Sequence, residues 1–141
     1  MDDSQVALVR QSWAKVAPIA PTAATIFYDR LFAVAPGVRG LFPQDISEQK
    51  LKLVQMLDTV VEGLGDLDGL VPAVQELGIR HAGYGAAPEH YDVVGECLLW
   101  TLAQGLGEEF TPAMRDAWVV AYSTLASVMI AAGEQAAAEA A

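Results

Sequence analysis

Apolar residues recur at helical spacing along nearly the whole 141-residue chain, and prolines and glycines divide these runs into segments. Residues three, four or seven apart share one face of an α-helix, whereas a strand needs apolar and polar residues to alternate. We find no sustained alternation between turn signals. The sequence therefore predicts one all-α domain over residues 1–141, with six or seven helices and one short turn.

Capping residues and helix breakers indicate where the helices begin and end. Residues 36–43 contain four breakers, two prolines and two glycines, so we expect a corner or a single helical turn there. We expect a turn over residues 66–69, and fraying in the alanine- and glutamate-rich residues 134–141. The main helices are expected to begin near Ser4, Pro21, Ser47, Pro72, Pro88 and Pro112, and to end near Pro18, Pro36, Leu64, Gly83, Gly107 and Gly133.

Several classes of function are excluded by charge and cysteine usage. A net charge of −10 argues against nucleic-acid binding, which needs a basic face. The lone Cys97 excludes an internal disulfide and any paired-cysteine metal site, and we interpret it as a small buried hydrophobe. The acidic start has no hydrophobic leader, and the longest uncharged run, residues 117–133, is short for a bilayer. We expect a cytoplasmic protein with no membrane partner.

His81 lies inside an apolar, helix-spaced run, Leu77–Tyr84, and shares a helical face with Val74 and Leu77. One interpretation is a core histidine that is hydrogen-bonded to a backbone carbonyl. The other is an axial ligand to a flat iron cofactor, which needs a neutral imidazole and an apolar slot. Such a site would also need polar groups on its opposite wall. The run alone leaves both interpretations open.

Two further residues have both a structural and a functional interpretation. Phe42 is a large aromatic side chain on a short connector, so it could plug the core edge or press against a cofactor plane. Gln49 lies four residues before Leu53 and so extends the apolar stripe of the next helix backwards. It is then either a polar side chain on the inward face or part of a solvated first turn.

The order of elements and several separated motifs resemble the globin family over roughly residues 4 to 133. The corner at Pro36 and Phe42 matches the place of a phenylalanine that is typical of the family. The Tyr91–Gly95 run, Tyr-x-x-Val-Gly, is similar to that of flavohaemoglobins and of single-domain bacterial haemoglobins of the Vitreoscilla type. The other matching positions are Trp13, Phe27-Tyr28, Gln49 with Leu53, His81 in Leu-Gly-x-x-His, and Trp118 with Tyr122.

This resemblance implies a globin fold around haem b, with His81 as the proximal iron ligand. On the distal side it implies Tyr28 and Gln49 as hydrogen-bond donors to bound O2, with Leu53 beside them. Lys52 is a candidate partner for the haem propionates and Arg80 is a weaker one, although either can be a solvated surface charge. The remaining haem-contacting residues implied are Phe42, Leu53, Leu77, Tyr91, Val94 and Leu98.

The resemblance also has gaps. The 141 residues leave no room for the reductase domain of flavohaemoglobins. Their proximal glutamate aligns with about Gly133, while the carboxylate here, Glu134, is one helical position or about 100° away. His90 is interpreted as an exposed residue at a helix start.

The leading functional hypothesis is high-affinity, reversible O2 binding. The family resemblance adds NO detoxification with an external reductase. Alternatives are an oxygen carrier or storage protein without enzymatic role, and a haem-based gas sensor. The expected ligands are O2, NO and CO, and the protein would be a monomer or a homodimer.

Overall fold

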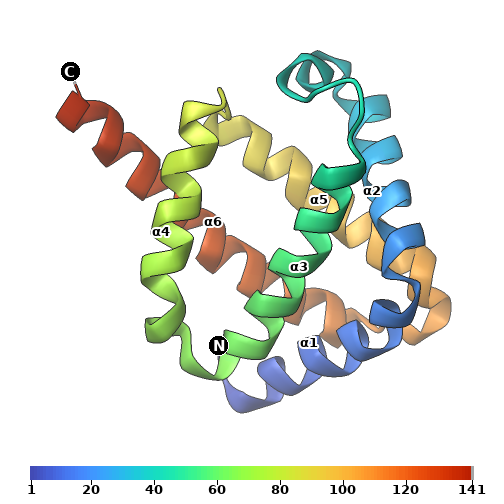
Figure 1. Cartoon of the computed structure of the whole chain (residues 1–141). Coiled ribbons are helices and arrows are strands. Elements are labelled where there is room, and N and C mark those ends of the chain that lie inside the picture. Colours follow the sequence, from blue (N-terminus) through green and yellow to red (C-terminus); the bar gives the residue numbers. More distant parts are fainter. Residues whose placement is uncertain (141) are drawn as a thin grey trace.

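The computed structural model describes residues 1–140, which form six α-helices and four short 3-10 helices but no strand. This confirms the predicted all-α fold. Figure 1 shows α6 crossing behind α3 and α4, with α2 on the opposite side of the molecule from the end of α4. The α-helices are α1 (Asp3–Val16), α2 (Ala20–Val34), α3 (Ser47–Gly63), α4 (Leu67–Gly83), α5 (Pro88–Leu106) and α6 (Pro112–Ala140); the 3-10 helices are η1 (Ala17–Ile19), η2 (Pro36–Leu41), η3 (Leu64–Asp66) and η4 (Gly107–Glu109).

Two helices begin within one residue of the predicted positions, Ser4 and Ser47, but these serines do not cap them. Asp2, not Ser4, caps α1: its Oδ1 accepts from the Gln5 amide at 2.7 Å, and the Gln5 side chain accepts in return from the Asp2 amide. Ser47 is the first residue of α3 and not its cap, because the Asp45 carboxylate accepts from both its amide and its hydroxyl. In each case an aspartate two residues earlier supplies the stronger acceptor.

The predicted turn over residues 66–69 and the predicted start of a helix at Pro72 are also wrong. Helix α4 begins at Leu67, because the Asp66 carboxylate accepts from the Gly69 amide at 3.2 Å and caps it. Pro72 then lies in the second turn, where its missing N–H removes a single backbone hydrogen bond. Helix α6 begins at Pro112 as predicted, and the preceding Thr111 caps it, since its Oγ1 accepts from the Met114 amide at 3.2 Å.

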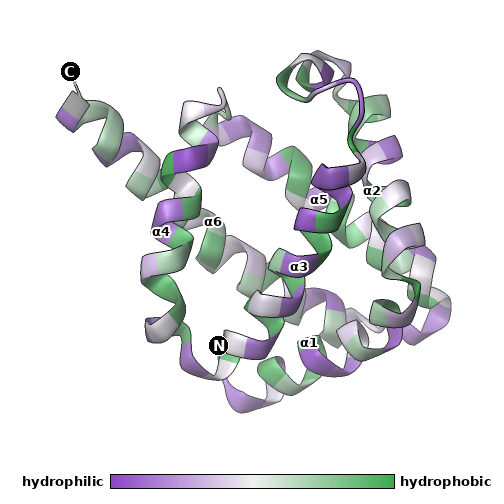
Figure 2. Cartoon of the chain, in the orientation of Figure 1, coloured by the Kyte–Doolittle hydropathy of each residue, from purple (hydrophilic) through white to green (hydrophobic). Residues whose placement is uncertain are grey.

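The core lies where α1, α2, α5 and α6 meet, and two tryptophans tie it together. Trp13 Nε1 donates to Asp58 on α3 at 2.6 Å, and Trp118 Nε1 donates to the buried Ser12 hydroxyl at 2.8 Å. The two indole rings pack edge to face, with centroids 6.4 Å apart. In Figure 2 the helices carry both apolar and polar bands, as amphipathic helices do.

Helix α6 shows why length and composition alone do not identify a membrane span. The segment Pro112–Glu139 is long and apolar enough to cross a bilayer by those criteria, which core helices of soluble proteins also satisfy. Within this fold it buries Ala117, Trp118 and Ala121 in the core. The helix continues to Ala140. The predicted fraying of residues 134–141 stays a prediction, and Ala141 lies outside the described residues.

Helices α4 and α6 approach so closely that their contact requires glycine. A Cβ added at the buried Gly78 would lie 2.3 Å from the backbone oxygen of Met129. Across the same contact, a Cβ at Gly133 would lie 3.1 Å from Ala82 Cβ and 3.2 Å from the Gly78 oxygen. Backbone atoms cannot rotate away as side chains do, so these glycines set how near α4 lies to α6. His81, one turn after Gly78, is positioned by this contact.

We expect Gly78→Ala to destabilise the protein, because the new Cβ must push α4 away from α6. Overpacking of this kind costs roughly 1–3 kcal/mol of unfolding free energy, which urea denaturation would measure. Gly83→Ala is the matched control: Gly83 also lies on α4, but a Cβ there meets nothing within 4 Å. Equal urea midpoints for the two variants would contradict the close contact.

Candidate functional site

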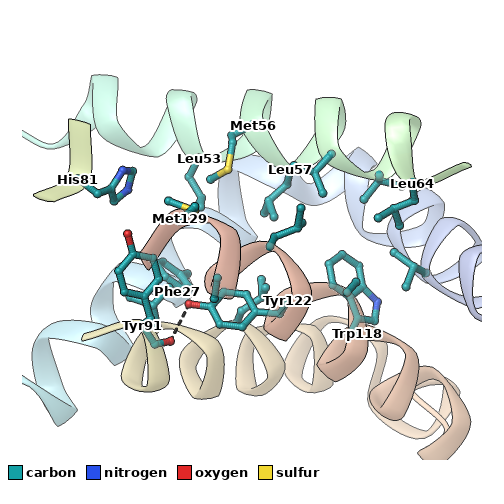
Figure 3. A pocket seen from close by; sticks show the side chains of 18 of the residues that line it. Phe27, Leu53, Met56, Leu57, Leu64, His81, Tyr91, Trp118, Tyr122 and Met129 are labelled. Carbon is teal, nitrogen blue, oxygen red and sulfur yellow. Dashed lines mark hydrogen bonds between the residues drawn. The ribbon is translucent and has the colours of Figure 1, made fainter. Parts of the chain in front are cut away.

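A cavity of about 920 Å³, counting its part open to solvent, lies among α3, α4, α5 and α6. Figure 3 shows leucines of α3 on one wall and aromatic side chains on the other. The apolar part of the wall is formed by Val9, Phe27, Leu53, Met56, Leu57, Val60, Val61, Leu64, Val94, Leu98, Leu125 and Met129.

His81 reaches the cavity from the last turn of α4. Its Nδ1 lies 2.8 Å from the Leu77 carbonyl oxygen. Since a carbonyl only accepts, Nδ1 carries the proton, and in the neutral form of the ring the lone pair lies on Nε2. A carbonyl partner on the second ring nitrogen is typical of metal-ligating histidines. His81 therefore makes the backbone hydrogen bond expected of a core histidine, and it also lies at the cavity, as an iron ligand would have to.

Tyr91 lies beside His81, with ring centroids 6.4 Å apart, and both line the same end of the cavity in Figure 3. The Tyr122 hydroxyl donates to the Tyr91 carbonyl oxygen at 2.6 Å. The Tyr122 ring also packs so tightly on Gly95 that a Cβ there would lie 2.7 Å from it. Burial raises the pKa of both phenols. Tyr91 and Gly95 of the Tyr-x-x-Val-Gly run thus pack on Tyr122, and Tyr91 lies beside His81.

Tyr28 and Gln49 meet, although they come from different helices. Tyr28 is buried on α2, and its pKa is raised to about 12 by burial, while a hydrogen bond with the Gln49 side chain lowers it. The rings of Phe32 and Phe42 surround the phenol, with centroids 5.9 and 5.8 Å away. Tyr28, Gln49 and Phe42 do not form part of the cavity wall. Leu53, one helical turn after Gln49, does.

The other predicted haem contacts divide into two groups. Val94 and Leu98 lie in the cavity wall together with Leu53, His81 and Tyr91. Leu77 is half-buried and contributes its carbonyl oxygen to His81. Lys52 is exposed and paired with Glu48, with 3.3 Å between Nζ and Oε1, and Arg80 is exposed as well. The haem-contact roles of these residues stay predictions.

The interpretation of His90 as exposed is wrong. It is half-buried, lines the cavity, and its Nδ1 accepts from the Ala87 amide at 2.9 Å, which caps α5. Its position three residues after Ala87 was the available signal, since a side chain there can reach back to the cap.

Met56 was also missed as a wall residue, although it lies three residues after Leu53 and so on the same face.

Cys97 is buried, as predicted, and burial raises the pKa of its thiol.

Gly133 and Glu134 are neighbours on α6 but differ in exposure. Gly133 is buried against α4 while Glu134 is exposed. This difference matches the rotation of about 100° between successive helical residues. The carboxylate of Glu134 therefore lies on another face of α6 from the one that contacts α4.

A model of the globin family matches residues 25–129. A flavohemoprotein of Bacillus subtilis is 28% identical over 133 residues, which are 92% of this chain and 33% of that protein. A flavohemoprotein of Bordetella parapertussis is 34% identical over 107 residues, which are 74% of this chain and 27% of that protein. The chain thus spans about a third of the length of these curated relatives.

Two solved structures resemble the fold closely. One is an engineered carbene transferase built on a protein assigned as a nitric oxide dioxygenase of Rhodothermus marinus. It has a TM-score of 0.88 and 26% identity, and the match covers 98% of this chain and 96% of that one. The other is a bacterial globin of Campylobacter jejuni, with a TM-score of 0.81, 24% identity, and coverage of 95% and 97%. The second likeness concerns the fold alone.

Proposed function

Because the chain belongs to the globin family, and is related to the globin domains of flavohemoproteins, we propose that it binds haem b through His81 and binds O2 reversibly. The observation that carries this proposal is a histidine ring that lines a large apolar cavity while its Nδ1 is hydrogen-bonded to a backbone carbonyl, which leaves Nε2 to face the cavity as a ligand. Such a nitrogen is the usual proximal ligand of haem iron.

The residues present fit a haem. His81 would hold the group through its ring nitrogen, and the group would supply an iron that can bind a diatomic ligand. The Leu77 carbonyl fixes the His81 ring, and Leu53, Val94 and Leu98 would keep water from the macrocycle. We retain Phe42 and Leu77 as further haem contacts and Lys52 or Arg80 as propionate partners. The Lys52–Glu48 pair is exposed, so breaking it costs little.

We propose that Tyr28 and Gln49 donate hydrogen bonds to the bound O2, beside Leu53. Bound O2 carries partial negative charge, so two donors favour it. Since burial raises the pKa of Tyr28 to about 12, its hydroxyl keeps the proton at neutral pH and remains a donor. Tight binding of this kind suits scavenging or chemistry on the ligand better than bulk transport.

A second candidate function is NO detoxification, in which NO reacts with bound O2 to give nitrate. It is favoured by the names of the flavohemoprotein relatives and by the dioxygenase assignment of one structural neighbour. It requires a separate reductase to return the iron to the ferrous state. Sustained NO consumption when a flavoprotein reductase and NADH are added would support it. A single stoichiometric burst would instead favour a carrier, a storage protein or a gas sensor.

Haem titration tests the proposal directly. We expect haem-free protein to bind one equivalent of haem with a sharp Soret band, and the reduced, ligand-free form to be five-coordinate. The cavity's second histidine, His90, already accepts a hydrogen bond through Nδ1 from the Ala87 amide, and Gln49 is a weak iron ligand. A low-spin, six-coordinate reduced spectrum at neutral pH would contradict this. Its persistence in a His90→Gln variant would assign the sixth ligand elsewhere.

We also keep the expectation of a cytoplasmic monomer or homodimer, with O2, NO and CO as ligands and no nucleic-acid partner.

A further inference from the structure

Arg39, near the end of η2, donates to three consecutive backbone carbonyls of the connector that follows. Its Nη1 lies 2.9 Å from the Pro43 oxygen and 3.4 Å from the Phe42 oxygen, and its Nη2 lies 2.8 Å from the Gln44 oxygen. The guanidinium carbon also lies 4.9 Å from the centre of the Phe32 ring. One side chain thus holds both the connector and an aromatic neighbour.

Apart from the Asp45 carboxylate, which accepts from Ser47 where α3 begins, few hydrogen bonds fix the connector over residues 42–46. It forms no helix or strand, and Pro43 has no N–H to donate. Within residues 1–140 no backbone amide donates to the three carbonyls that Arg39 contacts. The salt bridges within residues 1–140 are Lys15–Glu109 and Lys52–Glu48, and neither involves Arg39. No carboxylate in this range therefore competes with the backbone carbonyls for its guanidinium. Arg39 is therefore the side chain that holds the first three carbonyls of this connector.

The connector leads to both of the residues that we assign as distal donors. Phe42, at its start, packs edge to face on Phe32 at 5.5 Å and on Tyr28 at 5.8 Å. Phe32 itself contacts Tyr28 at 5.9 Å, so the three rings form a closed triangle. At its other end the connector enters α3, where Gln49 is the third residue. A shift of the connector would displace the Tyr28 ring and the Gln49 amide together.

We propose that Arg39 is a positioning residue that holds the Tyr28 hydroxyl and the Gln49 amide in their places over the bound ligand. This proposal rests on the proposed function, in which those two groups are the donors. The planar guanidinium offers donors in a fixed fork, which suits three carbonyls in sequence. A lysine carries the same charge but cannot reproduce the fork.

The test is ligand dissociation from Arg39→Met, whose side chain keeps most of the apolar stem. We expect O2 release to become roughly three- to tenfold faster and CO release to change by less than about twofold. In a background that carries both Tyr28→Phe and Gln49→Leu the same substitution should add nothing, because both donors that it positions are gone. Arg39→Lys should be intermediate. Arg115→Met, an exposed arginine on α6, is the matched control and should leave both rates unchanged.

A second measurement does not need haem. The Phe42 amide donates to the Arg39 carbonyl at 3.2 Å, so it reports on the corner itself. In the haem-free protein its hydrogen exchange should become about tenfold faster or more in Arg39→Met, while amides of the α1 core keep their protection. Unchanged exchange at Phe42 would show that Arg39 does not hold the corner, which overturns the proposal.

The outcomes separate this inference from the proposed function. Equal acceleration of O2 and CO release in Arg39→Met, with a lower melting temperature, would make Arg39 a structural residue only. No change in Arg39→Met together with fast O2 release in Tyr28→Phe would overturn the positioning role and leave the distal donors intact. If O2 release from Tyr28→Phe is as slow as from the parent chain, Tyr28 is not a donor to the ligand. Both proposals about the distal side would then fail.

Discussion

Haem-free His81→Ala protein is expected to bind haem at least about 100-fold more weakly than the parent chain, since even partners that only orient a metal ligand contribute about 10- to 100-fold. The substitution removes the one nitrogen that the cavity presents from α4, while Leu53, Val94 and Leu98 keep their apolar contacts. Alanine is a good helix former, so α4 should persist. The measurement is haem titration followed by Soret absorption.

Added imidazole should restore the Soret band of His81→Ala, because the small base can occupy the space that the side chain has left. His90→Ala is the matched control. His90 lines the same cavity, but its Nδ1 is used to accept from the Ala87 amide at the start of α5. Haem loss in His90→Ala together with full occupancy and an unchanged spectrum in His81→Ala would reverse the assignment of the proximal ligand.

Much of the fold was predictable because its helix ends are encoded locally. Pro88 and Gly107 bound α5 as the sequence predicts, and Gly107 has the positive φ of 57° that favours glycine at such an end. The errors arose where two local signals compete. Asp66 and Pro72 both mark a helix start, and only the three-dimensional structure shows that the Asp66 carboxylate is used.

Long-range contacts of the site were less accessible to sequence reasoning. Gly78 and Gly95 were noted only as parts of two family motifs, yet one meets the Met129 backbone and the other the Tyr122 ring. Arg39 read as part of a broken corner, and its three carbonyl partners depend on a loop shape that no periodicity specifies. His81 was identifiable because its residue type and its apolar face agree. Its Leu77 partner is also local, four residues earlier in the helix.

Tyr28→Phe is expected to speed O2 release by roughly ten- to a hundredfold, because a hydrogen bond to a partly charged acceptor contributes about 1.5–3 kcal/mol and every 1.4 kcal/mol is tenfold. Phenylalanine keeps the ring that packs on Phe27, Phe32 and Phe42, so only the hydroxyl is lost. Bound CO carries less negative charge, and its release should change much less. Stopped-flow dissociation of both gases is the measurement.

Gln49→Leu should act in the same direction, but the double variant need not be additive. The two donors share one acceptor, and Gln49 lies close enough to Tyr28 to lower the pKa of its phenol, so the two groups are coupled in the haem-free protein as well. Tyr84→Phe is the matched control: Tyr84 is 67% exposed, and its ring lies 6.3 Å from His81 on the proximal side. The Tyr84→Phe variant also loses a hydroxyl, but its side chain does not face the bound ligand.

An O2 release rate that stays within about twofold of the parent rate in Tyr28→Phe corresponds to less than about 0.5 kcal/mol, below the weakest hydrogen bond expected in a dry pocket. Tyr28 would then point away from the ligand, despite its burial and its contact with Gln49. The argument for tight binding and NO chemistry would lose its main support, because Gln49 alone offers one neutral amide. A plain oxygen carrier or storage globin would then account better for the same fold and the same His81.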